Sequence, residues 1–129
     1  MTGYLLDINA VLIALTAPEA LSTAARAALL KGPNILSVVS YWEVLLKSMK
    51  GNLTVGDPRT WWHDALEQLA ATPLRLRPAH IAGVYSLPPI HKDPFDRVLI
   101  AQAIEEALEL VTMDGEILRN ASARFRVVA

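Results

Sequence analysis

The chain has 129 residues, of which 53% are apolar, a net charge of −1 and no cysteine. This length predicts one domain, residues 1–129, that buries about two thirds of its unfolded surface, and the lack of cysteine excludes a disulfide framework. The near-neutral charge excludes a global basic field for nucleic acid, so any attraction to phosphate must be local. Polar residues interrupt every long apolar run and the first residues lack a basic, apolar leader, so we expect a cytoplasmic protein with no membrane partner.

The first predicted unit is a strand, a sharp turn and a helix. Residues 3–7 form an apolar run that ends in Asp7, and helical character continues over residues 9–17. Ligands bind beyond the carboxyl ends of strands in open α/β sheets, so Asp7 is a candidate ligand-binding residue. Capping of the following helix would explain this aspartate equally well. A second helix is predicted over residues 18–31.

A second strand at residues 35–37 leads into a helix that begins at Val38. Four apolar residues of this helix share one face and are predicted to lie in the core: Trp42, Leu45, Leu46 and Met49. Glu43 falls just off that face. An ion pair with Lys47, one turn further on, would account for this glutamate, and a role in a functional site is the alternative.

The next predicted elements look structural. A further helix carries Trp62 on its core face and Trp61 beside that face, where the indole is a plausible anchor for a partner. A short strand at residues 73–76 and a short helix at residues 79–87 follow. The three histidines of the chain show no metal-ligand spacing, so we treat His80 as an ordinary polar residue.

Residues 91–97, with the sequence HKDPFDR, have the character of a charged helix start. Asp93 fits the N-cap position, Pro94 the first helical position and Asp96 the third. Capping alone explains Asp93. The helix that follows is apolar nearly all round, so Asp96 would be buried at its mouth, where a carboxylate is costly unless a positive charge lies beside it.

A strand at residues 108–112, a short helix that starts near Asp114 and a final strand at residues 126–128 complete the pattern. This order predicts a three-layer α/β fold, with a central, mainly parallel sheet of about five short strands flanked by helices. Four acids then converge on the carboxyl edge of the sheet: Asp7, Glu43, Asp96 and Asp114. Crowded carboxylates repel one another unless a cation neutralises them, and oxygen ligands without cysteine favour Mg²⁺ or Mn²⁺.

Four stretches, in this order, resemble those of the PIN-domain nucleases, and in particular the VapC-like toxins of toxin–antitoxin pairs. They are Leu5–Asn9, Ser37–Glu43 with Lys47, Gly51 and Leu53, Leu87–Ala103, and Val111–Asp114. The resemblance runs almost end to end, and residues 91–103 form its most specific part. It implies a PIN-like fold and an acidic quartet of Asp7, Glu43, Asp96 and Asp114, with Asp93 as an auxiliary.

The resemblance also implies hydrolysis of RNA phosphodiester bonds with one or two Mg²⁺ or Mn²⁺ ions. Asp7 and Asp96 would bind metal directly, and Glu43 and Asp114 would hold metal or its water. Further contacts to carboxylates or to the phosphate backbone are expected from four residues: Asn9, Lys47, Lys92 and Arg97. The implied partners are the RNA substrate, a cognate VapB-like antitoxin and a second copy of the chain in a homodimer.

Ile8 departs from the family pattern, in which Thr or Ser commonly follows the first aspartate. Its side chain either points along the rim towards the metal or packs into the core. Ile8 supports the alternative of a catalytically weak or inactive PIN-like binding module. A second alternative reads residues 5–9 as the phosphoaspartyl motif of haloacid-dehalogenase-like phosphatases, but that motif needs a second aspartate where Asn9 stands.

Overall fold

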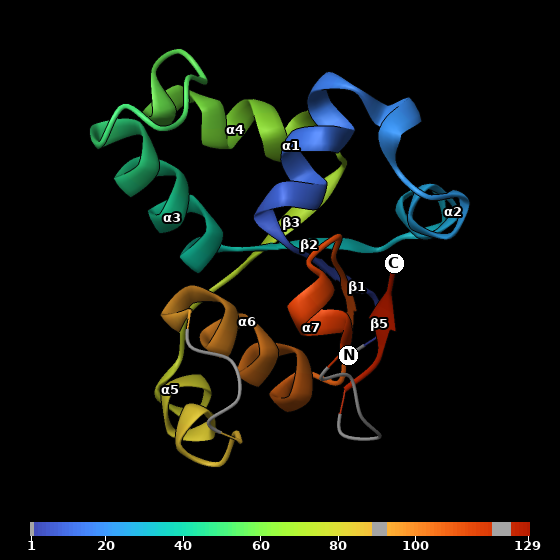
Figure 1. Cartoon of the computed structure of the whole chain (residues 1–129), viewed down its shortest axis with the longest axis vertical. Coiled ribbons are helices and arrows are strands. Elements are labelled where there is room, and N and C mark those ends of the chain that lie inside the picture. Colours follow the sequence, from blue (N-terminus) through green and yellow to red (C-terminus); the bar gives the residue numbers. More distant parts are fainter. Residues whose placement is uncertain (1, 89–92, 120–124) are drawn as a thin grey trace.

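The computed structural model describes residues 2–88, 93–119 and 125–129 and contains one sheet of parallel strands (Figure 1). The strands are β1 (Tyr4–Leu6), β2 (Asn34–Ser37), β3 (Ala71–Leu74), β4 (Glu109–Val111) and β5 (Val127–Val128). Their spatial order is β3-β2-β1-β4-β5, so the first strand of the chain is the central one. The predicted α/β fold, with a parallel sheet of five short strands, is confirmed.

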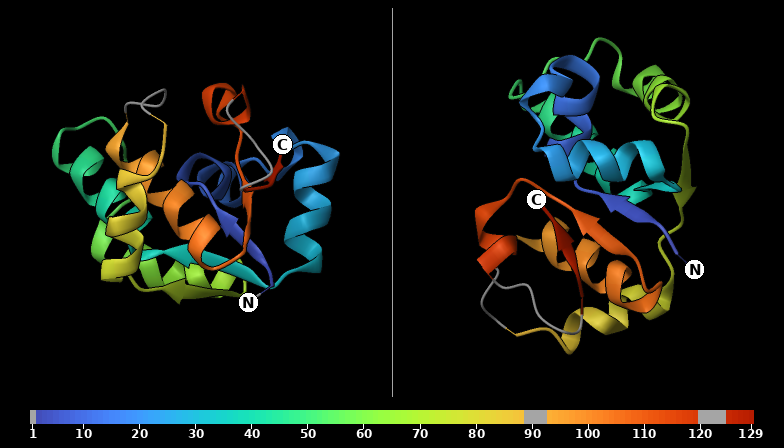
Figure 2. Two further views of the ribbon diagram at one scale, coloured as in Figure 1. Left: turned by 90° about the horizontal axis from the view of Figure 1, so that it is seen from below. Right: turned by 90° about the vertical axis from the view of Figure 1, so that its right-hand side faces the viewer.

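Helices cover both faces of this sheet (Figure 2). They are α1 (Ile8–Thr16), α2 (Thr23–Lys31), α3 (Val38–Met49), α4 (Pro58–Gln68), α5 (Pro78–Tyr85), α6 (Pro94–Glu105) and α7 (Gly115–Arg119), with a short 3-10 helix, η1, at Pro18–Ala20. None of the helices in the described ranges combines the length and the apolar character that a bilayer span needs.

The two faces of the sheet bury two separate apolar clusters, because successive side chains of a strand point to opposite sides. Leu6 of β1 packs in a cluster with residues of α1, α2, α3 and α4. Leu5, one residue earlier, packs in a second cluster with residues of α6 and α7. The same alternation holds for the neighbouring strands β2 and β4. The three-layer arrangement therefore follows from the apolar character of both faces of these strands.

Most predicted elements differ from the structure by one or two residues at their ends, and two differences have a clear physical reason. The helix predicted over residues 18–31 is divided, and α2 begins at Thr23, because the Ser22 hydroxyl accepts a hydrogen bond from Ala25 N at 3.0 Å and so caps a new helix start. Strand β3 begins at Ala71, two residues earlier than predicted. It is an edge strand, where Pro73 is tolerated.

Helix α3 presents a different face to the core from the one predicted. Its buried residues are Val39, Ser40, Glu43 and Val44. Trp42 is 54% exposed and Met49 is 80% exposed, so the predicted core stripe is wrong at both of its ends. The Ser37 hydroxyl accepts a hydrogen bond from Val39 N at 3.1 Å and fixes the start of the helix. Packing has thus buried a carboxylate and exposed an indole, which is the reverse of the usual preference of a charged and an apolar side chain.

Candidate functional site

Asp7 lies between β1 and α1, at the carboxyl end of the central strand. Its backbone N–H donates to the Val111 carbonyl at 2.9 Å, and its side chain is almost fully buried, with 2% of the residue exposed. Burial removes water from the carboxylate and raises its pKa, although hydrogen bonds from the Thr112 hydroxyl and the backbone N–H of Asn9 oppose this shift. The nearby charge of Asp114 raises the pKa further. Asp7 is therefore a buried acid with an acidic neighbour.

Thr112 connects the acids that follow β1 and β4. Its Oγ1 donates a hydrogen bond to Asp7 Oδ2 at 2.7 Å and accepts one from Asp114 N at 3.0 Å. Asp114 Oδ1 in turn accepts a hydrogen bond from Ile117 N at 3.3 Å, at the start of α7. Thr112 was not among the predicted site residues. Two signals pointed to it, namely a hydroxyl side chain at the end of a buried strand and its place in the stretch Val111–Asp114 that carries part of the resemblance.

Glu43 joins this edge of the sheet from α3. Its pKa is raised, chiefly by burial, and the negative charges of Asp7 and Asp93 add to the shift. Lys47 Nζ lies 3.1 Å from Glu43 Oε2, and its hydrogen bond and charge oppose the shift. Both interpretations of Glu43 thus describe its surroundings: the ion pair with Lys47 is present, and other candidate acids lie near enough to act on its charge.

The start of α6 has the capping geometry that the sequence predicted. Asp93 Oδ1 accepts hydrogen bonds from Phe95 N at 2.9 Å and from Asp96 N at 3.2 Å. Pro94 is the first helical residue, and Asp96 is buried in the first turn. Asp93 is exposed, and its charge acts on Glu43 of α3, a helix that contacts α6. The start of α6 therefore borders the same acidic edge.

The remaining candidates differ in how they are placed. Asn9 is exposed in the first turn of α1, next to Asp7. The Arg97 guanidinium donates to three carbonyls at the end of α5 and just beyond it, those of Val84, Leu87 and Pro88, at 3.1, 3.3 and 2.7 Å. These bonds tie Arg97 to the packing of α6 against α5. Lys92 lies outside the described residues.

Ile8 packs inward. It is 1% exposed and belongs to the apolar cluster that also contains Leu6 and Val11. The backbone turns from β1 into α1 at this point, and it directs Asp7 to the edge of the sheet and Ile8 into the core. The absence of a hydroxyl at this position therefore reflects core packing and does not indicate a weakened site.

The donors at this edge suit a hard divalent cation because they are carboxylates, and burial and acidic neighbours raise the pKa values of two of them, Asp7 and Glu43. Their arrangement is looser than a ready-made cage. Among the described residues, no three histidine, cysteine, aspartate or glutamate side chains are arranged to hold a metal ion as they stand. A cation that drew Asp7, Glu43 and Asp114 together would relieve their repulsion.

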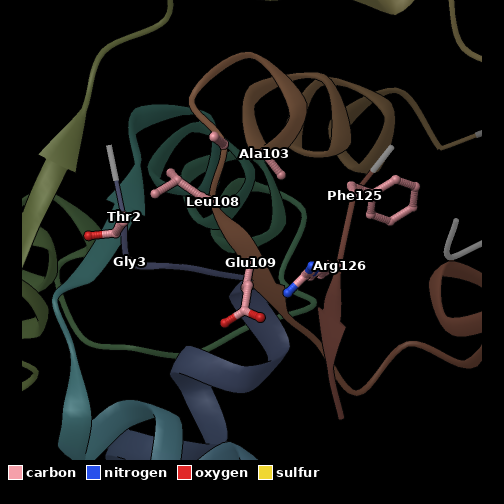
Figure 3. Close-up of a pocket in the computed structure, with 8 residues that line it drawn as sticks. Thr2, Gly3, Ala103, Leu108, Glu109, Phe125 and Arg126 are labelled. Carbon is pink, nitrogen blue, oxygen red and sulfur yellow. The ribbon is translucent and has the colours of Figure 1, made fainter. Parts of the chain in front are cut away.

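A pocket at the opposite edge of the sheet does not belong to this acidic cluster (Figure 3). It has a volume of about 310 Å³ and lies near Gly3 and Glu109, where β1 and β4 begin. Its wall also includes Phe125 and Arg126. The candidate acids follow the other ends of the same strands, so the sheet separates the two features.

Comparison with known proteins identifies relatives of this arrangement. A model of the PIN domain family matches residues 4–123. A search of curated protein sequences finds no match. Among solved structures, VapBC2 of Rickettsia felis bound to a promoter DNA fragment is similar at a TM-score of 0.72 and 14% identity, covering 98% of this chain and 97% of that one. A toxin–antitoxin complex of Klebsiella pneumoniae is similar at a TM-score of 0.61 and 21% identity, covering 98% and 96%. FitAcB of Neisseria gonorrhoeae is similar at a TM-score of 0.62 and 21% identity, covering 98% of this chain and 96% of that one.

Proposed function

The chain belongs to the PIN domain family, and from this premise we propose that it is a metal-dependent endoribonuclease that serves as the toxin of a toxin–antitoxin pair. One observation carries the proposal. Asp7 is buried at the carboxyl edge of a parallel sheet. The charge of Asp114 raises the pKa of Asp7, and the charge of Asp7 raises the pKa of Glu43. Such under-compensated acids are costly for folding and suited to binding a cation.

The solved relatives support the choice of partner. They include a toxin–antitoxin complex and a VapBC2 assembly on promoter DNA, and their chains align with this one over almost its whole length. We infer a cognate VapB-like antitoxin as the partner of this chain, and a homodimer as its assembly. The RNA substrate is part of the same proposal.

The acids would divide the work of the proposed reaction. Asp7 and Asp96 would hold Mg²⁺ or Mn²⁺, and Glu43 and Asp114 would hold the cation or its water, with Asp93 as the cap that orients the start of α6. When bound, the cation supplies positive charge to the scissile phosphate and makes an attacking water more acidic. The Thr112 hydroxyl holds Asp7 in place. Lys47, beside Glu43, offers positive charge to the phosphate backbone.

A PIN-like binding module without catalysis is the second candidate function. It is favoured by one observation, namely that no three of the described acids are arranged to hold a cation without movement. The inward packing of Ile8 removes the other support for this alternative. The two candidates differ in a direct way, because only a nuclease would turn over RNA in the presence of a divalent cation.

The test is cleavage of RNA by the purified protein across a titration of Mg²⁺ or Mn²⁺. We expect cleavage that stops with chelator and returns with added cation. Asp7→Asn and Asp96→Asn should each reduce it by more than the roughly 10 to 100-fold that loss of an outer contact to a metal ligand typically costs. Asp64→Asn is the matched control, because Asp64 is an exposed aspartate on α4. Near-wild-type cleavage by both site variants would contradict the nuclease.

A further inference from the structure

Helix α5 contributes little to the apolar core. Its only buried residue is His80, a polar side chain, whereas Ile81 and Tyr85 are 50% and 96% exposed. Within the described residues, its extensive contacts are made with α6, beside which it lies (Figure 1). A helix that buries so little apolar surface is best explained by what it does for the helix that it contacts.

The attachments between α5 and α6 run along the whole length of α5. Near its start, His80 Nε2 lies 2.8 Å from Oε2 of Glu106, the C-cap residue of α6. In its middle, Gly83 allows a close approach, because a Cβ built there would lie 3.4 Å from Ala101 Cβ. At its end, backbone carbonyls accept hydrogen bonds from Arg97. The two helices are therefore antiparallel, and the end of α5 lies at the start of α6.

The guanidinium of Arg97 binds this end of α5. Nη1 donates a hydrogen bond to Pro88 O at 2.7 Å, and Nη2 donates to Val84 O at 3.1 Å and to Leu87 O at 3.3 Å. The planar guanidinium spans three carbonyls at once, which a lysine ammonium is too compact to do. A positive charge also suits the end of a helix, where the last carbonyls carry a partial negative charge. Arg97 thus caps α5 from the neighbouring helix.

The backbone of Arg97 belongs to the first turn that carries the candidate acids of α6. Arg97 N donates to Asp93 O at 3.0 Å, and Asp93 Oδ1 accepts hydrogen bonds from Phe95 N and Asp96 N. Phe95 also contacts Trp42 of α3 edge to face, with ring centroids 5.1 Å apart. The start of α6 is therefore held from two sides, by α3 through Phe95 and by α5 through Arg97. Asp96 lies between these two attachment residues in the chain.

We propose that Arg97 is a positioning residue of the metal site. Its bonds to the end of α5 set the place of Asp96, and its guanidinium does not contact the phosphate backbone of the substrate. The inference rests on the nuclease function proposed above, in which Asp96 binds the cation. A functional side chain has to be held within about 0.5 Å of its productive position. Outer contacts that orient a metal ligand typically change metal affinity by roughly 10 to 100-fold.

The experiment measures the affinity for Mn²⁺ by calorimetric titration without RNA. Arg97→Lys keeps the charge but cannot span the three carbonyls, so the Kd should rise by about 10-fold. Arg97→Met loses the same bonds and also a positive charge, whose removal favours a cation, so its Kd should rise less. Arg26→Lys is the matched control, because Arg26 is exposed on α2, and it should bind Mn²⁺ like the wild type.

Hydrogen exchange in chelator tests the geometry itself. The amides of Phe95 and Asp96, which bond the helix cap, should be protected in the wild type and exchange faster in Arg97→Lys. The amide of Leu99, which is buried further along α6, should exchange at the same rate in both. The wild-type measurement decides even if Arg97→Lys does not fold. Amides of Phe95 and Asp96 that become protected only when Mn²⁺ is added would show that the cation orders this turn, and would overturn the proposal.

Two further results would overturn the proposal in a protein whose wild type binds Mn²⁺. If Arg97→Lys melts at a lower temperature but binds Mn²⁺ as tightly as the wild type, Arg97 serves the fold alone. If Arg97→Met lowers the salt dependence of RNA binding in chelator by about one unit of slope, the guanidinium contacts a phosphate. A wild type that neither binds Mn²⁺ nor cleaves RNA would instead reject the proposed function, and the role of Arg97 in a metal site with it.

Discussion

Two polar clusters are buried in this fold, and they treat charge in opposite ways. At the carboxyl edge of the sheet, burial and acidic neighbours raise the pKa values of Asp7 and Glu43. Between α5 and α6, the fully buried His80 bonds Glu106 Oε2 through Nε2 at 2.8 Å, and the Arg77 side chain bonds the same oxygen. Those two partners lower the pKa of Glu106. The first cluster accumulates like charge, whereas the second pairs opposite charge.

This difference separates the candidate functional site from a cluster that stabilises the packing of two helices. The His80 cluster holds α5 against α6, and Arg97 adds a second attachment near the start of α6. Together they fix the helix that brings Asp93 and Asp96 to the acidic edge. A buried charge that is paired with an opposite charge supports folding. A buried charge without such a partner reduces stability unless a bound ligand of opposite charge neutralises it. The His80 cluster therefore supports only the part of the acidic edge that α6 contributes, Asp93 and Asp96.

The largest expected effect comes from removing one charge in each cluster with matched carboxylate-to-amide variants. In chelator, Glu106→Gln should destabilise the protein, because it removes the negative charge that pairs with the fully buried His80 and with the Arg77 side chain. Asp7→Asn should raise the free energy of unfolding, because it removes a buried charge and its repulsion with Asp114. Urea unfolding of the two variants and the wild type measures both. Destabilisation by both variants to the same extent would contradict the distinction between the clusters.

The pH dependence of these variants follows from the directions of the shifts. The folded pKa of Asp7 lies above its ordinary value of 3.8. Ionisation of Asp7 therefore lowers the stability of the protein as pH rises from 3.8 through the raised pKa, and this loss disappears in acid. The folded pKa of Glu106 lies below 4.5, so its contribution is full above 4.5 and is lost as pH falls through the lowered value. The advantage of Asp7→Asn and the deficit of Glu106→Gln should therefore both shrink on acidification.

Much of the acidic edge was predictable from residue order. A parallel sheet brings the carboxyl ends of its strands to one edge, so the positions of Asp7 and Asp114 followed from the strands that precede them. The cap at Asp93 and the burial of Asp96 followed from helix-start chemistry. These inferences need only local rules and the topology of the sheet.

Other features depend on contacts between residues far apart in the chain. Thr112 reaches Asp7 across 105 positions, and His80 reaches Glu106 across 26, so neither pairing has a local signal. The exposed side of α3 was predicted wrongly because the hydrophobic pattern assigns Trp42 to the core. In the structure, the face that carries Glu43 is buried instead. From the sequence, Arg97 was predicted to contact the phosphate backbone. In the structure, its guanidinium donates hydrogen bonds to carbonyls at the end of α5 and just beyond it.

The second prediction concerns the border between the acidic edge and the core. Ile8→Thr places a hydroxyl in an apolar cluster, which should cost about 1–3 kcal/mol of stability. It should not improve the use of limiting Mg²⁺, because the side chain points away from the edge. A metal titration of cleavage and the melting temperature, measured on both proteins, test this. Better cleavage at low Mg²⁺ with unchanged stability would place residue 8 at the rim and contradict its inward packing.

The third and smallest expected effect concerns Thr112, whose hydroxyl belongs either to the functional site or to the fold. Thr112→Val keeps the shape of the side chain but removes the donor to Asp7 and the acceptor for Asp114 N. If the hydroxyl holds Asp7 ready for a cation, the Kd for Mn²⁺ should rise roughly 10 to 100-fold, or about 1.4 to 2.7 kcal/mol.

Thr112→Ser distinguishes the hydroxyl from the methyl group, because it keeps the two hydrogen bonds and loses only packing. Calorimetric titration with Mn²⁺ should therefore give Thr112→Ser an affinity close to that of the wild type, even if its melting temperature falls. In the opposite pattern, Thr112→Val would melt at a lower temperature but bind Mn²⁺ as tightly as the wild type. Thr112 would then have a structural role at the end of β4, as His80 has in α5. The acidic edge would then hold its carboxylates without help from this hydroxyl.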